Sequence, residues 1–377
     1  MKLKAKLFLV FILFQVAIQA KDESIKVGIL NKQKIYHCSI KIQRGTYAVI
    51  ADGKYFCTLL KSENLSIDYL DSLELRTKGK IIKAKDIKLR GQAYVNHFTL
   101  KARSRKGIAY DDDLHVYHGS SYMQLINTVN LENYVSAVVE GEAGYRLPQE
   151  YYKLQAILCR TYALKNMQRH LHQGFNICDK VHCQVYHHKC TKSNIYEATI
   201  ATNSLVVVDD NLQLINTIFH ANCGGETCNS EDVWGKQLSY LRCVTDSFCT
   251  TSRSSYWKKS YPKAKLSTYF NIGSAKNKEV ELFAFCQADE RRAENRLLNK
   301  RLTQIRKDLK LRSTYFYAEE QGDSIVLYGR GYGHGVGLCQ QGGIEMAHRK
   351  YSYVDILKKY YVGINIINRK ALHFFLE

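Results

Sequence analysis

The sequence predicts an α+β protein, with a β-rich N-terminal module followed by a mixed α/β domain. Short runs rich in β-branched and aromatic residues, separated by Asn, Asp and Gly, extend from Ile25 to about Met123. From Leu131 onward the apolar residues recur instead at helical spacing. Because 377 residues are enough for two domains, we expect the β-rich module at 21–126 and the mixed domain at 127–377.

The first 20 residues have the pattern of an export signal. Three lysines precede the apolar run Leu7–Phe14, and Ala17–Ala20 ends in the small residues that signal peptidase cuts after. Gln15 and Gln19 interrupt the run before it reaches the roughly 20 apolar residues of a membrane-spanning helix. Residues 1–20 are therefore predicted to be a signal peptide, and the protein to be exported to the periplasm or cell envelope. An uncleaved anchor is the alternative, and it would be the chain's one contact with a membrane.

We expect the positive charge of the protein to bind polyanions of the cell envelope. The chain has 55 Lys and Arg residues against 35 Asp and Glu, a formal net charge of +20, which suits wall polymers and lipid head groups in an exported protein. It has no zinc-finger spacing, no RNP-like strand and no DNA-reading helix, so nucleic acid is not an expected partner. Leu298, Leu302, Ile305 and Leu309 recur at helical spacing, which predicts an amphipathic helix with a cationic face within Arg291–Arg312.

The second domain begins with two helical segments. One starts near Leu131, and the next follows Pro148, a residue favoured in a first helical turn. Lys153 and Arg160 are seven residues apart, so they share one line along the second helix. This line borders the apolar stripe that the helix is expected to bury, which consists of Leu154, Ile157, Leu158, Thr161 and Leu164.

Nine of the 12 cysteines fall into two groups. Disulfides with unassigned pairing are expected among most of seven cysteines in an exported protein: Cys38, Cys57, Cys223, Cys228, Cys243, Cys249 and Cys286. The second group places four nitrogen or sulfur donors, the set that tetrahedral zinc prefers, within one short stretch: His172, Cys178, His182 and Cys183. From this chemistry alone, a zinc site and a disulfide both remain open.

Three parts of the chain resemble the stage II sporulation protein D family, also called SpoIID/LytB. The resembling segments are Leu131–Glu142 with Pro148–Ala163, Cys178–Tyr186 with Phe219–Gly235, and Gly329–Gly342 with Ile356–Tyr361. The resemblance extends from about Asn127 to Ile366, and the order and spacing of the blocks agree with the family. Cys223 and Cys339 depart from it, because they stand where the family usually has serine.

The resemblance implies a peptidoglycan lytic transglycosylase. Such an enzyme cleaves the MurNAc–GlcNAc bonds of denuded, stem-peptide-free glycan strands and leaves 1,6-anhydroMurNAc ends, in cell wall remodelling, division or sporulation. Glu142 falls at the family's catalytic glutamate. One carboxyl suffices, because the muramyl C6 hydroxyl attacks its own C1 and Glu142 can donate one proton and recover another. We expect Val138, Val139 and Tyr145 to form an apolar wall that keeps this carboxyl protonated.

Glu140 is the neighbouring acidic residue that could share or modify this role. In an extended segment Glu140 and Glu142 would point the same way and raise each other's pKa, whereas in a helix they would diverge by about 200°. Most relatives have a small uncharged residue at the position of Glu140. We therefore interpret Glu140 as a modifier of the site.

The resemblance also implies substrate-binding and metal-binding residues. Lys153 and Arg160 would bind the lactyl carboxylate that removal of a stem peptide uncovers. His334 and Gln340 would line the cleft, and His220 and Asn222 are further candidates, with a packed structural role equally open for each. His172, Cys178, His182 and Cys183 lie where the family's zinc ligands are expected, and four protein ligands would make the zinc structural.

A second class of function remains open from the sequence. Some members of the family are described as amidase enhancers, which bind the wall and activate an N-acetylmuramoyl-L-alanine amidase without cutting glycan. The predicted partners are therefore peptidoglycan glycan strands and, in the alternative, a cell wall amidase. The presence of Glu142 with Lys153 and Arg160 favours the enzyme.

Overall fold

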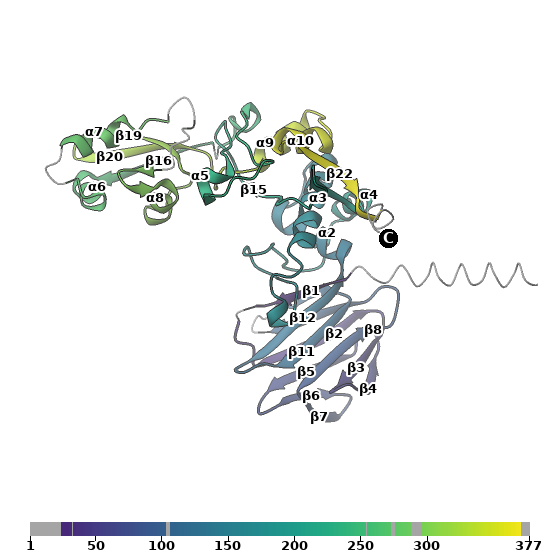
Figure 1. The fold of residues 1–377 in the computed structure, drawn as a ribbon. Coiled ribbons are helices and arrows are strands. Elements are labelled where there is room, and N and C mark those ends of the chain that lie inside the picture. Colours follow the sequence, from purple (N-terminus) through teal and green to yellow (C-terminus); the bar gives the residue numbers. More distant parts are fainter. Residues whose placement is uncertain are drawn as a thin grey trace, which may run out of the picture. The chain divides into compact units, whose positions relative to one another are not determined.

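The structure is a computed structural model that describes residues 24–31, 33–102, 106–253, 255–272, 276–287, 291 and 296–370. The predicted signal peptide at 1–20 lies outside these residues. The predicted α+β class is confirmed, since the chain contains both helices and several sheets, and its N-terminal region is β-rich (Figure 1). The chain divides into two compact units. The first runs to Tyr145 and includes Ala163–Asn203, and the second comprises Arg146–Tyr162 and the chain from Ser204.

Two sheets form most of the first unit. One sheet has the strand order β13-β1-β12-β11-β8-β3-β4 and the other β10-β9-β2-β5-β6-β7. The strands are β1 (Ser24–Ile29), β2 (His37–Arg44), β3 (Tyr47–Ala51), β4 (Lys54–Leu59), β5 (Asn64–Tyr69), β6 (Leu73–Thr77), β7 (Lys80–Ala84), β8 (Asp86–Gly91), β9 (His97–Ala102), β10 (Ile108–Asp111), β11 (Asp113–His118), β12 (Met123–Asn130) and β13 (Ile177–Cys178). The region predicted to be β-rich therefore does consist of strands.

The two sheets pack through apolar side chains. Tyr47 of β3 meets Phe98 of β9 edge to face, with ring centroids 6.2 Å apart. Cys38 Sγ of β2 lies 3.9 Å from Met123 Sδ of β12. Along β2 and β9 buried residues alternate with more exposed ones, as expected for strands with one face in a core.

The first unit extends past the predicted domain boundary at 126/127. That boundary falls inside β12, which pairs with β1 and β11 on its two sides and so belongs wholly to the sheet. Helix α2 (Leu131–Ala143) follows at once, because the side chain of Asn130 accepts hydrogen bonds from the N–H groups of Glu132 and Asn133 and caps it. The unit also holds η1 (Leu171–Gln173), β13 and α4 (Ser193–Ala201).

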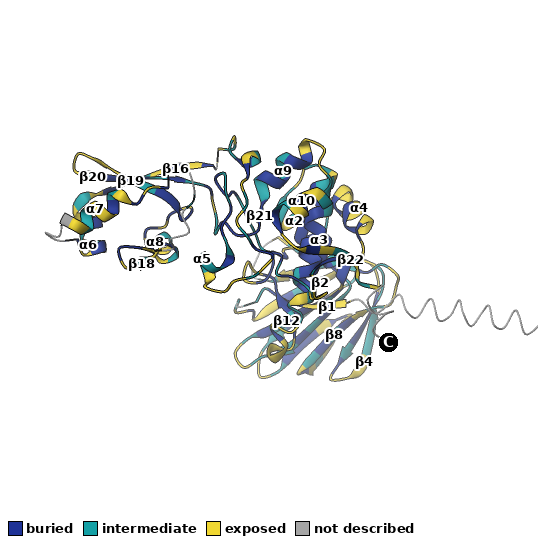
Figure 2. Cartoon of the chain, turned by 45° about the horizontal axis from the view of Figure 1, so that its top comes forward, coloured by how far each residue is buried: buried dark blue, intermediate teal, exposed yellow. Residues whose placement is uncertain are grey.

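The second unit contains residues 146–162, which include most of helix α3 (Gln149–Lys165), and the chain from Ser204. Strand β14 pairs with β22, β15 pairs in parallel with β21, and β16-β20-β19 form a three-stranded sheet. The predicted stripe of α3 is buried except at Leu164 (Figure 2). The elements are β14 (Leu205–Asp209), β15 (Phe219–His220), α5 (Ser230–Trp234), η2 (Ser247–Cys249), β16 (Tyr256–Pro262), α6 (Lys263–Phe270), α7 (Lys276–Ala284), β17 (Arg296–Leu297), β18 (Lys300–Arg301), α8 (Leu302–Asp308), β19 (Tyr315–Gln321), β20 (Ser324–Arg330), β21 (Leu338–Cys339), α9 (Gln340–His348), α10 (Tyr353–Tyr360) and β22 (Ile364–Asn368).

The cationic helix predicted within Arg291–Arg312 is shorter than expected. Within the described residues of this stretch, 291 and 296–312, α8 alone is helical, and strands β17 and β18 precede it. Leu298 and Asn299 have φ values of 45° and 62° and form the turn between these strands, which prevents an earlier helix start. Leu298, Leu302, Ile305 and Leu309 are nevertheless all buried in one apolar core.

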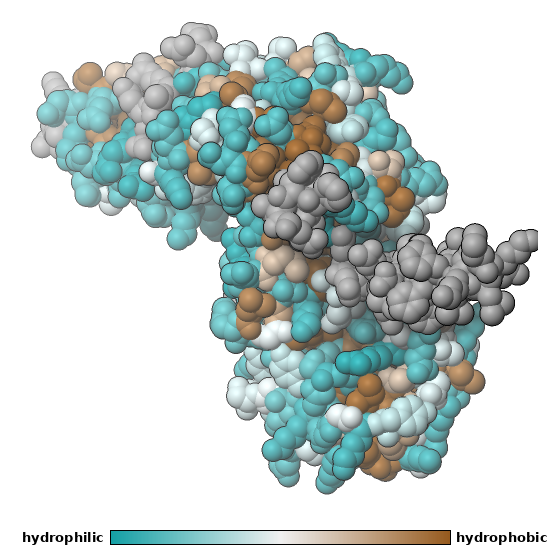
Figure 3. Space-filling model, turned by 45° about the vertical axis from the view of Figure 1, so that its right-hand side comes forward, coloured by the Kyte–Doolittle hydropathy of each residue, from teal (hydrophilic) through white to brown (hydrophobic). Residues whose placement is uncertain are grey.

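The surface is largely hydrophilic on the face drawn in Figure 3, with small apolar patches between polar side chains. Among the described residues, no helix has both the length and the apolar character needed to cross a membrane.

Candidate active site and metal clusters

Glu142 lies in the last turn of α2, where its side chain is half-buried. Its Oε1 accepts a hydrogen bond of 3.0 Å from the backbone N–H of Val185. The two neighbours of Val185 hold this donor in place. Gln184 Oε1 accepts from the hydroxyl of Tyr134 at 3.1 Å, and the hydroxyl of Tyr186 donates to Asn127 Oδ1 at 2.7 Å, both in the buried interior of the first unit.

The environment of Glu142 favours its protonated form. Burial raises the pKa of Glu142 above its ordinary value, and the hydrogen bond from Val185 only partly opposes this effect. Oε1 is already occupied by a neutral donor. Oε2 is therefore the oxygen best placed to carry an exchangeable proton.

Glu140 has the opposite environment, although it is only two residues away. Since the segment is helical, the two side chains leave α2 about 200° apart. Glu140 accepts two 2.6 Å hydrogen bonds from Thr191, one from its N–H and one from its hydroxyl. Burial works against ionisation here too, but these bonds outweigh it and lower the pKa of Glu140. Glu140 therefore stays ionised and turned away from Glu142.

Gly141 allows the Val185 segment to approach α2 closely. A Cβ at this position would lie 2.8 Å from the carbonyl oxygen of Val185 and 3.1 Å from its Cγ1. Both distances are shorter than ordinary van der Waals contacts, and a backbone oxygen cannot move aside without its peptide. The missing side chain at 141 therefore sets the distance between Val185 and Glu142.

We expect Gly141→Ala to destabilise the protein and lower its activity. Alanine is the better helix former by about 1 kcal/mol, but the forced displacement of Val185 should cost about 1–3 kcal/mol and disturb the hydrogen bond to Glu142. Thermal unfolding and turnover measure the two effects. A higher Tm for Gly141→Ala would show that helix propensity dominates and that the close approach is unimportant.

The apolar wall expected around Glu142 is only partly present. Val138 and Val139 are fully buried in the interior. Tyr145, in contrast, is 61% exposed, and Lys192 Nζ lies 5.5 Å from the centre of its ring. Tyr145 therefore does not form the wall. It follows the end of α2 at Gly144, whose φ of 74° turns the chain out of the helix.

Lys153 and Arg160 do not form the predicted pair of accessible cations. Lys153 is half-buried, and its Nζ lies 2.6 Å from Glu150 Oε1. Arg160 is fully buried, and its Nη1 donates to the carbonyl of Leu205 at 3.1 Å. The prediction that Arg160 binds a substrate carboxylate is therefore wrong, because its side chain is enclosed and ties α3 to β14.

The two predicted histidines of the second unit stand side by side, with ring centroids 5.3 Å apart. His334 Nε2 lies 3.0 Å from the carbonyl of Phe219, and Nδ1 accepts from the N–H of Val336 at 3.1 Å. Burial lowers the pKa of His334 to about 4, so the ring is neutral at physiological pH. His220 is buried, and its Nδ1 contacts the carbonyl of Val336 at 3.1 Å. Both rings therefore hold the β15 and β21 segments together.

Asn222 and Gln340 differ in accessibility. Asn222 is 1% exposed, and its amide nitrogen contacts Cys249, Ser255 and Gln341 while its oxygen accepts from Gly224 N–H. These contacts favour the packed structural role that the sequence left open for Asn222. Gln340 is half-exposed at the first residue of α9.

A cluster of four metal-binding side chains forms in the first unit, with one change from the predicted set. His170, Cys178, His182 and Cys183 place one donor atom each within 4.8 Å of one another. Cys183 Sγ lies 3.4 Å from His170 Nε2 and 3.6 Å from His182 Nδ1. His172 is not part of the cluster. It lies in η1 with an exposed side chain and contacts its neighbour Gln173 at 2.9 Å, whereas His170 is buried and stacks on Phe175.

The structure contains none of the disulfides expected among Cys38, Cys57, Cys223, Cys228, Cys243, Cys249 and Cys286. Cys223 and Cys249 approach each other, but their sulfurs are 3.4 Å apart, well beyond a disulfide bond of about 2.05 Å. Cys38 is enclosed between the two sheets instead, next to Met123.

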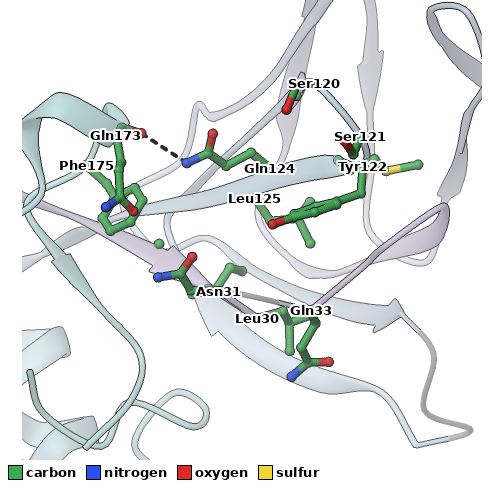
Figure 4. A pocket seen from close by; sticks show the side chains of 14 residues that line it. Leu30, Asn31, Gln33, Ser120, Ser121, Tyr122, Gln124, Leu125, Gln173 and Phe175 are labelled. Atoms are coloured by element: carbon green, nitrogen blue, oxygen red, sulfur yellow. Dashed lines mark hydrogen bonds between the residues drawn. The ribbon is translucent and has the colours of Figure 1, made fainter. Parts of the chain in front are cut away.

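A surface pocket of the first unit lies among β1, β12 and the segment after η1 (Figure 4). Asn31, Tyr122 and Gln124 face it, and the amide of Gln124 donates to the carbonyl of Gln173 at 3.0 Å. None of the predicted site residues lines this pocket. We assign it no part in the chemistry.

A half-buried glutamate at the end of a helix and a neighbouring His/Cys cluster define the site, and comparison with known proteins gives its class. Residues 119–208 match the family model SpoIID, described as stage II sporulation protein. Stage II sporulation protein D of Bacillus subtilis is 28% identical over 274 residues, which are 66% of this chain and 77% of that protein.

Two further relatives extend the comparison. An uncharacterized protein of Brachyspira hyodysenteriae is 28% identical over 70% of this chain and 73% of its own length. The amidase enhancer of Bacillus subtilis is 24% identical over 62% of this chain and 40% of that protein. The chain is therefore similar to the SpoIID family, over the matched residues 119–208 and over about two thirds of its length in the relatives.

Proposed function

We propose that this protein is a peptidoglycan lytic transglycosylase with Glu142 as its catalytic residue. The observation that carries the proposal is the environment of that carboxyl, which is half-buried, bonded to one neutral N–H and raised in pKa. Similarity to the SpoIID family is consistent with action on the cell wall. The finer assignment of the reaction rests on the chemistry of Glu142.

The proposed reaction uses one carboxyl group twice. Glu142 Oε2–H gives its proton to the oxygen that bridges MurNAc and GlcNAc, and the bond from C1 of MurNAc to that oxygen breaks. The C6 hydroxyl of the same MurNAc then forms a bond to C1, and its proton passes to the Glu142 carboxylate. The products are a GlcNAc end with a free hydroxyl and a 1,6-anhydroMurNAc end, and Glu142 is protonated again.

Glycoside hydrolysis fits this site less well. It needs a second carboxylate, either as nucleophile at about 5 Å or as base for a water molecule at about 6.5–9.5 Å. The adjacent candidate, Glu140, leaves the helix in a different direction and is held by Thr191. In the transglycosylase reaction the C6 hydroxyl of the substrate's MurNAc attacks C1, so no second carboxylate is needed.

We also propose that His170, Cys178, His182 and Cys183 hold a structural zinc ion. Two nitrogen and two sulfur donors at these separations fit tetrahedral zinc and leave no coordination position for water. Bound zinc would supply a fixed cross-link rather than chemistry. Cys183 is two residues before Val185, so the cross-link would hold the N–H that contacts Glu142 Oε1.

The proposed setting is the cell envelope, and the proposed substrate is denuded glycan. The predicted signal peptide and the net charge of +20 support an exported protein that binds an anionic polymer. Of the two cations expected to meet the lactyl carboxylate, Lys153 keeps a partly exposed side chain. Arg160 does not, so preference for denuded strands would depend on Lys153 and not on Arg160.

The rate should fall as the pH rises through the pKa of Glu142. The free enzyme must carry the proton, and since burial raises this pKa, the active form persists to higher pH than an ordinary glutamate would allow. We expect kcat/KM on denuded glycan to decline on the alkaline side of that pKa, with the same profile for Glu140→Gln. A profile that rises over the same range would show that Glu142 acts first as a base.

A second candidate is an amidase enhancer, and the similarity to the Bacillus subtilis amidase enhancer supports keeping it. One experiment separates the two functions. Amidase-treated peptidoglycan is incubated with the protein, and the products are analysed by mass spectrometry for anhydromuramyl ends. We expect these ends to appear. Faster amidase release without such ends would favour the enhancer.

A further inference from the structure

A second cluster of metal-binding side chains lies in the second unit. Cys223, Asp246, Cys249 and Cys339 are all buried, and each places one donor atom within 4.8 Å of the other three. Cys223 follows β15, Asp246 caps η2, Cys249 is the last residue of η2, and Cys339 ends β21. Three stretches of chain far apart in the sequence therefore converge on one point.

The spacing of the donor atoms is that of a tetrahedral site. Cys223 Sγ lies 3.4 Å from Cys249 Sγ and 3.2 Å from Asp246 Oδ2. Zinc bonds of about 2.3 Å to sulfur and about 2.0–2.2 Å to oxygen require separations of roughly 3.5–3.8 Å between ligands at tetrahedral angles. A shift of a few tenths of an ångström would bring these atoms to such positions.

Surrounding groups hydrogen-bond to the proposed ligands and orient them, as the partners of metal ligands do in metal sites. Tyr360 donates its hydroxyl proton to Asp246 Oδ2 at 2.9 Å, and the N–H of Phe248 donates to Oδ1 at 3.0 Å. Cys339 Sγ accepts from the N–H groups of Cys223 at 3.3 Å and Gly342 at 3.4 Å. Backbone donors of this kind stabilise a thiolate.

The cluster lacks a positive partner. Among the described residues, no ion pair involves Asp246, although its side chain is fully buried. Taking a carboxylate and potential thiolates out of water is costly without a compensating cation. A bound divalent ion would compensate this charge.

We propose that Cys223, Asp246, Cys249 and Cys339 form a second, structural zinc site. The ion would join β15, η2 and the start of α9, and so fix the segment that carries His220 and Asn222. Gly342 leaves room for the carboxylate of Asp246, since a Cβ at this position would lie 2.3 Å from Asp246 Oδ2. This inference does not depend on the transglycosylase proposal.

The test is the zinc content of the full chain, purified without oxygen or chelator and measured by elemental analysis. We expect two zinc ions per wild-type chain, one in Cys249→Ser, one in Cys183→Ser and none when both changes are combined. Cys38→Ser, which removes a buried cysteine outside both clusters, should keep two. Asp246→Asn supplies a milder variant in case Cys249→Ser does not fold, and it should weaken zinc retention in a competition with chelator.

Cobalt loading identifies the ligands directly. Removing Cys249 should reduce the thiolate-to-cobalt absorption of the chain, because three of the five proposed thiolate ligands belong to this cluster. Equal zinc content in wild type and Cys249→Ser would overturn the proposal. A disulfide between Cys223 and Cys249 in zinc-treated protein, found by peptide mapping, would overturn it as well. One zinc in wild type and none in Cys249→Ser would support this site and reject the first cluster.

Discussion

Glu142→Gln is expected to abolish formation of anhydromuramyl ends. Glutamine has nearly the same shape and can still accept the hydrogen bond from Val185, but it has no proton to lend to the bridging oxygen. Loss of general acid and base catalysis typically costs about 10²–10⁴-fold in rate. Turnover of denuded glycan, followed by mass spectrometry of the products, measures this loss.

The same variant should fold at least as well as the wild type. Because burial raises the pKa of Glu142, the associated stability is present below the ordinary glutamate pKa and is lost as the pH rises through the raised value. At neutral pH a neutral side chain is therefore favoured, and Tm should stay level or rise. Glu140→Gln is the matched control. It should lose stability, because it weakens the hydrogen bonds from Thr191, but it should keep most of its activity. Equal activity losses in the two variants would contradict a special role for Glu142.

Cys183→Ser should produce the largest loss of stability among the variants of the first unit. Under the zinc proposal it removes a ligand of the His170, Cys178, His182 and Cys183 cluster. A zinc concentration about 1,000-fold above Kd stabilises the folded state by about 4 kcal/mol, which corresponds to about 10 °C in Tm. Activity should fall as well, because the N–H of Val185 is two residues away.

The measurement is thermal unfolding with and without added zinc. The wild type should show a Tm that rises with zinc, and the zinc-dependent rise should be smaller in Cys183→Ser. His172→Ala tests the ligand assignment, since the structure places His172 outside the cluster, and it should behave as the wild type. A variant of His170 that retains full zinc content would contradict the assignment.

The fold class and the two helices around Glu142 could be predicted from the sequence, because they depend on local signals. Asn130 at a cap position and the apolar periodicity of α3 act over a few residues. The actual extent of the first unit, which passes the expected boundary at 126/127, could not be predicted, because β13 lies about fifty residues further along the chain and still pairs with β1. Pairing between distant segments leaves no local signal.

The roles of individual side chains likewise depend on contacts that the local sequence does not reveal. Spacing alone could not distinguish His170 from His172, since the choice depends on the short turn of η1, which exposes one ring and leaves the other against Phe175. Likewise Arg160 and Lys153 share a helix line, but packing against Leu205 encloses only Arg160. The role of Gly141 was not predicted, because the contact that makes it necessary comes from Val185. In the second cluster, Cys223 and Cys339 were noted as departures from the family, and only the fold brings them to Asp246.

The ionisation of Glu142 itself is the most direct test of the account. Selective ¹³C labelling of glutamate carboxyls, with Glu142→Gln to assign the signal, allows its titration to be followed by NMR in the folded protein. We expect the Glu142 signal to titrate above the ordinary glutamate pKa of about 4.3 and the Glu140 signal to titrate below it. A Glu142 carboxyl that titrates at or below the ordinary value would contradict the proposed proton transfer.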